Sequence, residues 1–206
     1  NAALARAHER AARRPVLVGI NHPNRSWLIS PTDIIAATNT DFIELCNNCT
    51  YNMNEGDATH PSTERLWDIA NAVRLKQVKQ RPLWGTASDD AVDHQREPGG
   101  PFIDTQAGNG WIVVWATNLS ETALMDSLRR GRFYASTGVE LKTASLIRNE
   151  LVIEVVPAAG RTYEIEFIGT AKKVSVEPGA ADAPATDAYS AAIGRSLKIV
   201  KGTRAR

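Results

Sequence analysis

His22 and Asp90 are the two residues of this chain whose positions most favour metal or acid–base chemistry. His22 closely follows residues 16–20, a short, mainly apolar run. Such a run is typical of a strand buried on both faces in a parallel sheet covered by helices. His22 would lie at the carboxyl end of that strand, the edge at which α/β folds collect their catalytic loops. A lone histidine is more often a hydrogen-bonded loop residue, so the prediction depends on the residues at the ends of the other strands.

Two more predicted strands also end in polar residues. Residues 42–46 are followed by Asn47, Asn48 and Cys49, and residues 83–87 lead into Ser88, Asp89 and Asp90. Because parallel strands place their carboxyl ends at one edge of a sheet, we expect His22 and Asp90 to lie close enough to share an ion or a bridging water. Glu44, Asp57 and Asp89 are equally well explained as capping or loop carboxylates.

Cys46 and Cys49 are the only cysteines, spaced as C-N-N-C. Two cysteines are too few for a disulfide framework, and without a second such pair they do not make an all-cysteine zinc site. We expect free thiols, one of which could lie beside a metal centre.

The elements that must position these residues alternate between strand and helix. Ser30 and Asp33 are spaced to cap a helix over residues 31–37, and Ser62 or Thr63 to begin another that runs to about Lys79. A third helix follows Ser120 and ends at Gly131, after a buried strand at 111–116 whose Trp111 and Trp115 we expect in the core. Another helix is predicted within residues 1–13. This alternation predicts β-α-β units around a parallel sheet or barrel.

Beyond Gly138 the pattern changes to period-two alternation, which is typical of antiparallel strands. The predicted strands are residues 151–156, 162–168, 173–176 and 197–200. The sequence therefore predicts an α/β portion at 1–138 and a small antiparallel β extension at 139–206, joined by a buried seam. Glu64, Arg65 and Asp68 are predicted to serve as surface and capping residues of their helix.

Composition narrows the function classes. Of the 206 residues, 43% are hydrophobic and 23% are charged, a composition typical of a globular protein. The formal net charge of +1 does not indicate the strongly basic surface that binds nucleic acid. No apolar run approaches the length of a membrane span, and the start lacks the apolar core of a signal peptide. Because the chain begins at Asn1, inside a helical pattern, we expect it to be part of something longer.

Six motifs, in order, resemble the PHP (polymerase and histidinol phosphatase-like) domain family of metal-dependent phosphoesterases, in particular a bacterial branch with a C-terminal β extension. They are I-N-H-P-N (20–24), F-I-E-L-C-N (42–47), N-E-G-D-x-x-H-P-S-T-E-R-x-W-D-I (54–69), G-x-A-S-D-D-A (85–91), G-x-G-W-I-V-V (108–114) and R-R-G-R-F-Y-A-S-T-G-V (129–139). The resemblance implies the C-terminal part of a distorted, TIM-barrel-related β/α barrel followed by an antiparallel appendage. It also implies divalent metals, zinc, manganese or iron, at the carboxyl edge.

The resemblance further implies which residues ligate the metal. His22 matches a family ligand, and Asp90 matches the Asp of a terminal D-x-H pair. The second position after Asp90 is Val92, so the nearest imidazole is His94. Cys49 stands where related sequences often have His, and a thiolate can ligate zinc. The early H-x-H pair of the family is absent, so the ligand set within this chain is incomplete.

These observations lead to two functional hypotheses. The first is a metal-dependent phosphoesterase in which His22 and Asp90 serve the chemistry on a small phosphorylated substrate, without nucleic acid or membrane partners. The second is a degenerate PHP-like domain that binds without catalysis. A sugar-binding module using the tryptophans is weaker, because most of them lie in or beside predicted buried strands. We expect this segment alone to be inactive and a longer form to require a divalent metal.

Overall fold

A three-stranded parallel sheet lies at the centre of the N-terminal half. The computed structural model describes residues 6, 9, 16–49, 51–91, 107–179 and 188–206, so most of the helix predicted within 1–13 lies outside the described residues. The strands are β1 (Gly19–Ile20), β2 (Phe42–Asn47) and β3 (Trp84–Ser88), in the spatial order β1-β2-β3. The carboxyl ends of all three strands therefore meet at one edge.

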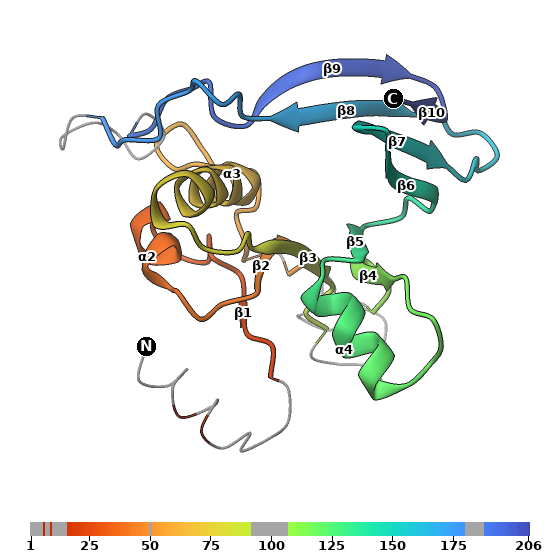
Figure 1. The fold of residues 1–206 in the computed structure, drawn as a ribbon, viewed down its shortest axis with the longest axis horizontal. Helices are drawn as coiled ribbons and strands as arrows, with labels where there is room; N and C mark the ends of the chain where they lie inside the picture. Colours follow the sequence, from red (N-terminus) through yellow and green to blue (C-terminus); the bar gives the residue numbers. More distant parts are fainter. Residues whose placement is uncertain (1–5, 7–8, 10–15, 50, 92–106, 180–187) are drawn as a thin grey trace.

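Two helices cover one side of this sheet (Figure 1). Helix α2 (Pro31–Ala36) begins with the predicted capping box, in which Ser30 and Asp33 bond each other's backbone N–H groups. Helix α3 (Thr63–Val73) begins at the N-cap residue Ser62 and continues as a π-helical turn, η1 (Arg74–Val78). The apolar faces of the helices meet the sheet in one cluster of buried residues: Ile34, Ile43, Leu66, Ala70 and Leu83.

The predicted barrel is wrong. The parallel pairing stops at β3, because β4 (Trp111–Val114) pairs antiparallel with β5 (Phe133–Ser136) in a separate two-stranded sheet. A barrel needs every strand bonded on both edges, and the described residues form four small open sheets. The described part of the chain is instead mixed α/β, with more strands than helices.

Helix α4 (Glu121–Arg129) packs beside the β4–β5 pair and begins, as predicted, at Ser120. Trp111 and Trp115 do not lie in the core as predicted, since their exposed fractions are 37% and 38%. β4 pairs antiparallel with β5 outside the parallel sheet, so the burial on both faces that is expected of a parallel strand does not apply to it.

Gly131 ends α4 in the left-handed region, at φ +68°, and a Cβ atom there would lie 2.5 Å from carbon atoms of the Trp84 ring. We expect Gly131→Ala to lower the free energy of unfolding by about 2 kcal/mol, through backbone strain and overlap with the indole. Urea denaturation measures this change. Gly160→Ala is the matched control, because Gly160 has φ +72° and open space around its Cβ position. Equal losses in the two variants would contradict a role for the Trp84 contact.

The strands after Gly138 pair antiparallel. Strands β6 (Leu141–Ile147), β7 (Glu150–Val155) and β10 (Arg204–Ala205) form one sheet, and β8 (Glu164–Gly169) pairs with β9 (Arg195–Lys201) in another. Figure 1 shows β8 and β9 as a long arch that reaches from the side of α3 to β10. The strand predicted at 173–176 is absent, and that segment has a turn at its start and is otherwise irregular.

A buried seam joins α3 to the segment between β8 and β9. Ile69, Ala72 and Val73 pack against Val176 and Ile193. Polar contacts reinforce the packing: Arg65 donates to the carbonyls of Tyr189, Ser190 and Ile193, and Lys76 donates to those of Ala171, Lys172 and Val174. Arg65 is thus a bridging residue between distant segments, contrary to the predicted surface role.

Asp68 lies at the same seam, with its carboxylate against the backbone of Gly194. Burial raises the pKa of Asp68 to about 6, Arg65 opposes the shift and Glu64 adds to it. Because the folded state then binds a proton more tightly than the unfolded chain, stability should fall as the pH rises from about 4 to about 6. Partial exposure limits the effect to about 1 kcal/mol. Asp68→Asn should remove it, and identical pH profiles of unfolding for variant and wild type would contradict the assignment.

No helix within the described ranges is long and apolar enough to cross a membrane.

Candidate functional site

Glu44 is a buried carboxylate at the carboxyl edge of the parallel sheet, with 5% of its surface exposed. Its Oε2 atom accepts from the backbone N–H of His22 at 2.6 Å and from Nδ2 of Asn47 at 3.0 Å. Its Oε1 atom accepts from the Ser88 hydroxyl at 2.5 Å. The three donors come from the ends of β1, β2 and β3. One carboxylate therefore joins the ends of all three strands.

Asn47 connects Glu44 to Asp90. Its Nδ2 atom also donates to Oδ2 of Asp90, at 3.2 Å, so the two carboxylates share one amide group. The Oδ1 atom of Asn47 accepts from the backbone of Cys49 and from the side chain of Asn52. Asn47 is 2% exposed and fully engaged, which holds this Glu44–Asn47–Asp90 cluster in one arrangement.

An irregularity in β2 makes this cluster possible. The register of β2 against β3 shifts between Glu44 and Cys46, so that Glu44 faces Thr86 and Cys46 faces Ala87. In a regular strand, residues three apart point to opposite faces of the sheet. The shift allows Glu44 and Asn47 to lie on the same side and to bond each other. Such bulges often re-aim side chains beside active sites.

His22 and Asp90 both adopt left-handed backbone conformations, with φ values of +35° and +48°. Residues other than glycine rarely adopt this region, although Asp and His do so more readily than most. Conformations of this kind persist where the surrounding structure enforces them, and they gather at functional sites. At these two positions the enforcing contacts include the hydrogen bonds to Glu44 and Asn47.

The structure brings only some of the predicted site residues into the cluster through their side chains. Asp90 joins it through its carboxylate, whereas the contacts that link His22 and Cys49 to the cluster are made by their backbone N–H groups. His94 lies outside the described residues.

Glu44 and Asn47 are the residues that the sequence did not single out for this site. Glu44 is equally well explained from the sequence as a loop or cap carboxylate, and Asn47 carries no signal of its own beyond its place at a strand end. One feature of the sequence could have identified Glu44: it is a single acid inside the mainly apolar strand F-I-E-L-C. An acid buried in such a strand needs hydrogen-bond partners, which indicates a polar cluster around it.

The thiols at this edge are free, as expected. Burial raises the pKa of the Cys46 thiol, and the nearby carboxylates of Glu55, Glu44 and Glu64 raise it further. This shift favours the neutral thiol of Cys46 and makes it a poor nucleophile.

The Glu44 and Asp90 carboxylates are chemically suited to a divalent cation, but they are fewer than the ligands that a catalytic metal usually has. Carboxylate oxygens such as those of Glu44 and Asp90 suit hard divalent ions such as manganese, and they can also bind zinc. Among the described residues, however, no three His, Cys, Asp or Glu side chains gather as a metal-binding group. A catalytic metal usually has three protein ligands, so the described residues supply part of such a site.

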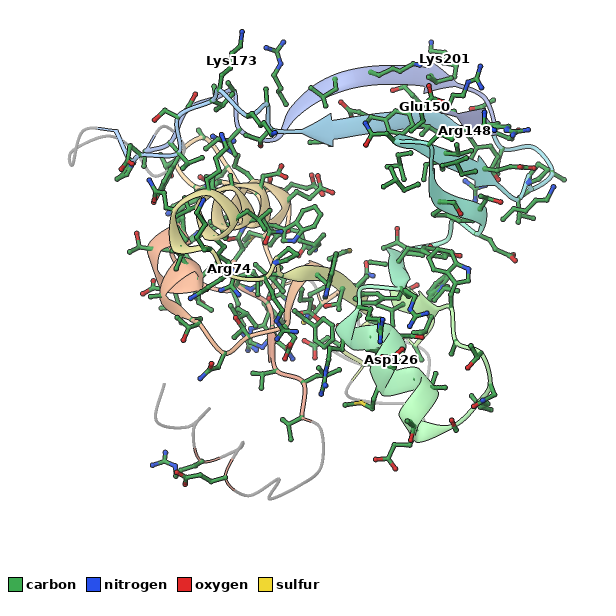
Figure 2. The ribbon with its side chains drawn as sticks, in the orientation of Figure 1. Arg74, Asp126, Arg148, Glu150, Lys173 and Lys201 are labelled. Carbon is green, nitrogen blue, oxygen red and sulfur yellow. The ribbon has the colours of Figure 1, made fainter. Side chains whose placement is uncertain are left out.

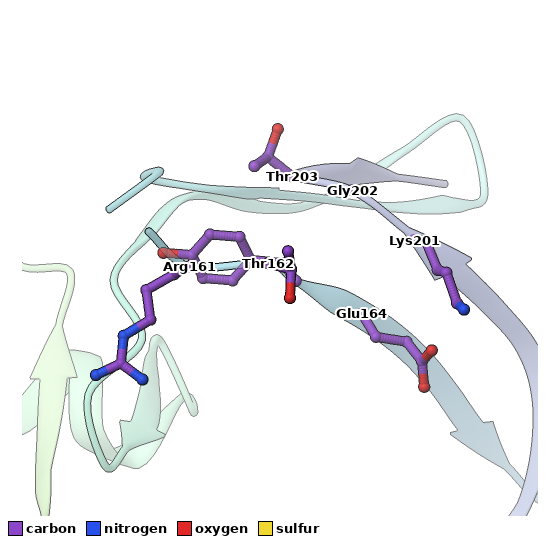
Figure 3. Close-up of a pocket in the computed structure, with 7 residues that line it drawn as sticks. Arg161, Thr162, Glu164, Lys201, Gly202 and Thr203 are labelled. Carbon is purple, nitrogen blue, oxygen red and sulfur yellow. The ribbon is translucent and has the colours of Figure 1, made fainter. Parts of the chain in front are cut away.

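A hollow of about 700 Å³ lies elsewhere, at the ends of β8 and β9 (Figure 3). The charged residues that line it, Arg161, Glu164 and Lys201, are exposed. Glu164 and Lys201, which are register partners, point to one side and Arg161 points away from them (Figure 3). Because these groups do not converge on one point, the carboxyl edge of the parallel sheet is the better candidate site.

Comparison with known proteins gives no relative on which to rest a function. No family model, no curated protein and no solved structure matches this chain.

Proposed function

We propose that this protein is a metal-dependent hydrolase that acts on small phosphate esters, with Glu44 and Asp90 as its metal-binding carboxylates. The observation that carries the proposal is the Glu44–Asn47–Asp90 cluster, in which an acid of β2 and an acid just after β3 share one amide donor. The motif resemblance to PHP-domain phosphoesterases supports the choice of phosphate esters. Parallel sheets commonly bind ligands at this edge.

Each residue of the cluster has a distinct role in this proposal. Asp90, which is half-buried, would offer its carboxylate to a cation, and the more deeply buried Glu44 would offer a second one. Ser88, Asn47 and the His22 backbone hold the Glu44 carboxylate in position. A bound divalent metal would lower the pKa of a water molecule and neutralise charge on the phosphoryl oxygens.

A second candidate function is a domain that binds a ligand without catalysis. It is favoured by the position of the Asn47 amide, which donates to both carboxylates and so satisfies them without a cation. In that case the cluster is a structural network that fixes the strand ends.

Metal content distinguishes the two functions. The full-length protein, purified without chelators, should contain at least one tightly held divalent ion per chain by elemental analysis, and titration with manganese should restore it after chelation. The Asp90→Asn variant should hold less metal, and Asp126→Asn on the surface of α4 should match the wild type. A wild-type protein that holds no metal and gains none in the titration would leave the binding domain as the function.

A further inference from the structure

A second pair of chemically competent side chains, Asp57 and His60, lies in the loop that leads from β2 to α3. The Nδ1 atom of His60 is 2.9 Å from Oδ1 and 3.1 Å from Oδ2 of the Asp57 carboxylate. The Thr59 hydroxyl lies 2.9 Å from the same nitrogen. Because an ionised carboxylate only accepts hydrogen bonds, this contact favours a proton on Nδ1 and leaves Nε2 as the nitrogen that exchanges protons.

The orienting acid is itself fixed. Asp57 accepts from the backbone N–H groups of Thr59 at 2.7 Å and His60 at 2.8 Å, and from the Thr59 hydroxyl. Hydrogen bonding, from the Thr59 backbone above all, lowers the pKa of Asp57 to about 2. Asp57 therefore stays ionised across the pH range in which an imidazole titrates.

A stacking contact with an aromatic ring also holds the His60 imidazole. The ring of Trp27 stacks on that of His60, with centroids 4.1 Å apart and planes 8° from parallel. Trp27 and the preceding Ser26 have φ values of +56° and +53°. A left-handed conformation is unusual for a bulky residue, so the surrounding contacts must enforce it.

The same loops connect this pair to the Glu44–Asn47–Asp90 cluster. Asn24, which is 3% exposed, donates to the carbonyls of Met53 and Pro61 and so locks the His22–Trp27 loop against the loop that carries His60. At the other end of its loop, His22 donates to Glu44. Both loops follow the carboxyl ends of their strands, so His60 and the cluster belong to the same edge of the sheet.

We infer that His60, oriented by Asp57 and Trp27, is the general acid of the proposed phosphate ester hydrolysis. This inference rests on the proposed function. A water oxygen bonds to phosphorus while the bond from phosphorus to the ester oxygen breaks, and the electron pair of that bond leaves with the ester oxygen. Protonated His60 donates its Nε2 proton to this oxygen and releases the alcohol. The water's surplus proton passes to solvent, from which His60 is protonated again.

The test compares two esters with different leaving groups. The full-length His60→Gln variant should hydrolyse phenyl phosphate about 100-fold more slowly than the wild type, because phenolate is a poor leaving group without protonation. For 4-nitrophenyl phosphate, whose leaving group needs little help, the loss should stay below about 10-fold. The alkaline fall of the wild-type pH–rate profile for phenyl phosphate should disappear in the variant. Asp126→Asn, on the surface of α4, should hydrolyse both esters as fast as the wild type.

The outcomes separate this inference from the proposed function. If His60→Gln slows both esters equally, or neither, while Asp90→Asn abolishes hydrolysis, the general-acid role is overturned and the hydrolase stands. If the wild type with added manganese or zinc hydrolyses neither ester, both proposals fall. As a readout besides activity, the imidazole ¹⁵N resonances of the wild type should show the Nδ1–H tautomer of His60. The Nε2–H tautomer would overturn the orienting role of Asp57.

Discussion

Asp90→Asn should reduce phosphate ester hydrolysis by the full-length protein about 100-fold or more, measured as kcat/KM with manganese present. The substitution keeps the size of the side chain and replaces one carboxylate oxygen by an amide, so the cluster loses a charge that would bind the cation. The remaining oxygen can still accept from Asn47, so the fold should be retained. Glu44→Gln should have a comparable effect on activity, with an added loss of stability, because its amide would face donor groups.

The control for this prediction is Asp126→Asn. Asp126 lies on exposed α4, where it pairs with Arg130 and Arg132 (Figure 2). Its carboxylate is also hydrogen-bonded, yet it has no place at the carboxyl edge of the parallel sheet. The kcat/KM of Asp126→Asn should stay within about twofold of the wild-type value. Exposed ion pairs contribute little to stability, and neither Asp126 nor its arginine partners belong to the Glu44–Asn47–Asp90 cluster. Equal activity of the Asp90, Glu44 and Asp126 variants would contradict the site.

Arg74→Met should lower the free energy of unfolding by about 3 kcal/mol in urea denaturation. Arg74 is 1% exposed, and its guanidinium donates to the carbonyls of Arg81 and Ala37, both at 3.1 Å. Burial lowers the pKa of Arg74, and Arg81 lowers it further while Asp41 opposes the shift. Methionine fills a similar volume but removes the donor to the Arg81 carbonyl and leaves the Ala37 carbonyl with the Thr40 hydroxyl alone. The two Arg74 contacts hold the C-cap of α2 and the segment after η1 to the start of η1.

Arg130→Met is the matched control for Arg74. Arg130 makes an exposed ion pair with Asp126, and its side chain retains 66% exposure. Its loss should cost less than about 1 kcal/mol. If the two variants lose similar stability, the buried guanidinium does not connect α2 to η1 in the way described.

The sequence predicted helix starts and individual strands well where the prediction depended only on residues close together in the chain. The capping residues Ser30, Ser62 and Ser120 mark the beginnings of α2, α3 and α4, because a cap depends only on residues within one turn. The alternating segments at 151–156 and 162–168 are β7 and β8. The same rule failed at 173–176, where the Val174 carbonyl accepts from Lys76 rather than from a neighbouring strand.

The pairing of strands was not predictable in the same way. An apolar strand such as β4 has the same sequence pattern whether its partner is parallel or antiparallel, and β4 pairs with β5 instead of extending the sheet of β1, β2 and β3. The expected barrel, and with it the burial of Trp111 and Trp115, depended on parallel pairing throughout. Which edges bond is decided by long-range packing, and alternation along the chain does not encode it.

For the candidate site, the sequence by itself determined that polar residues follow the three parallel strands, and therefore that Asp90 and the His22 loop share one edge. Only the tertiary structure decided that Glu44 and Asn47 form the centre of that edge. Their hydrogen bond requires the register shift in β2, and a shift of register depends on how β2 meets β3. Because strand residues alternate between faces, a single irregularity changes which side chains can meet, and no spacing rule along one strand reveals it.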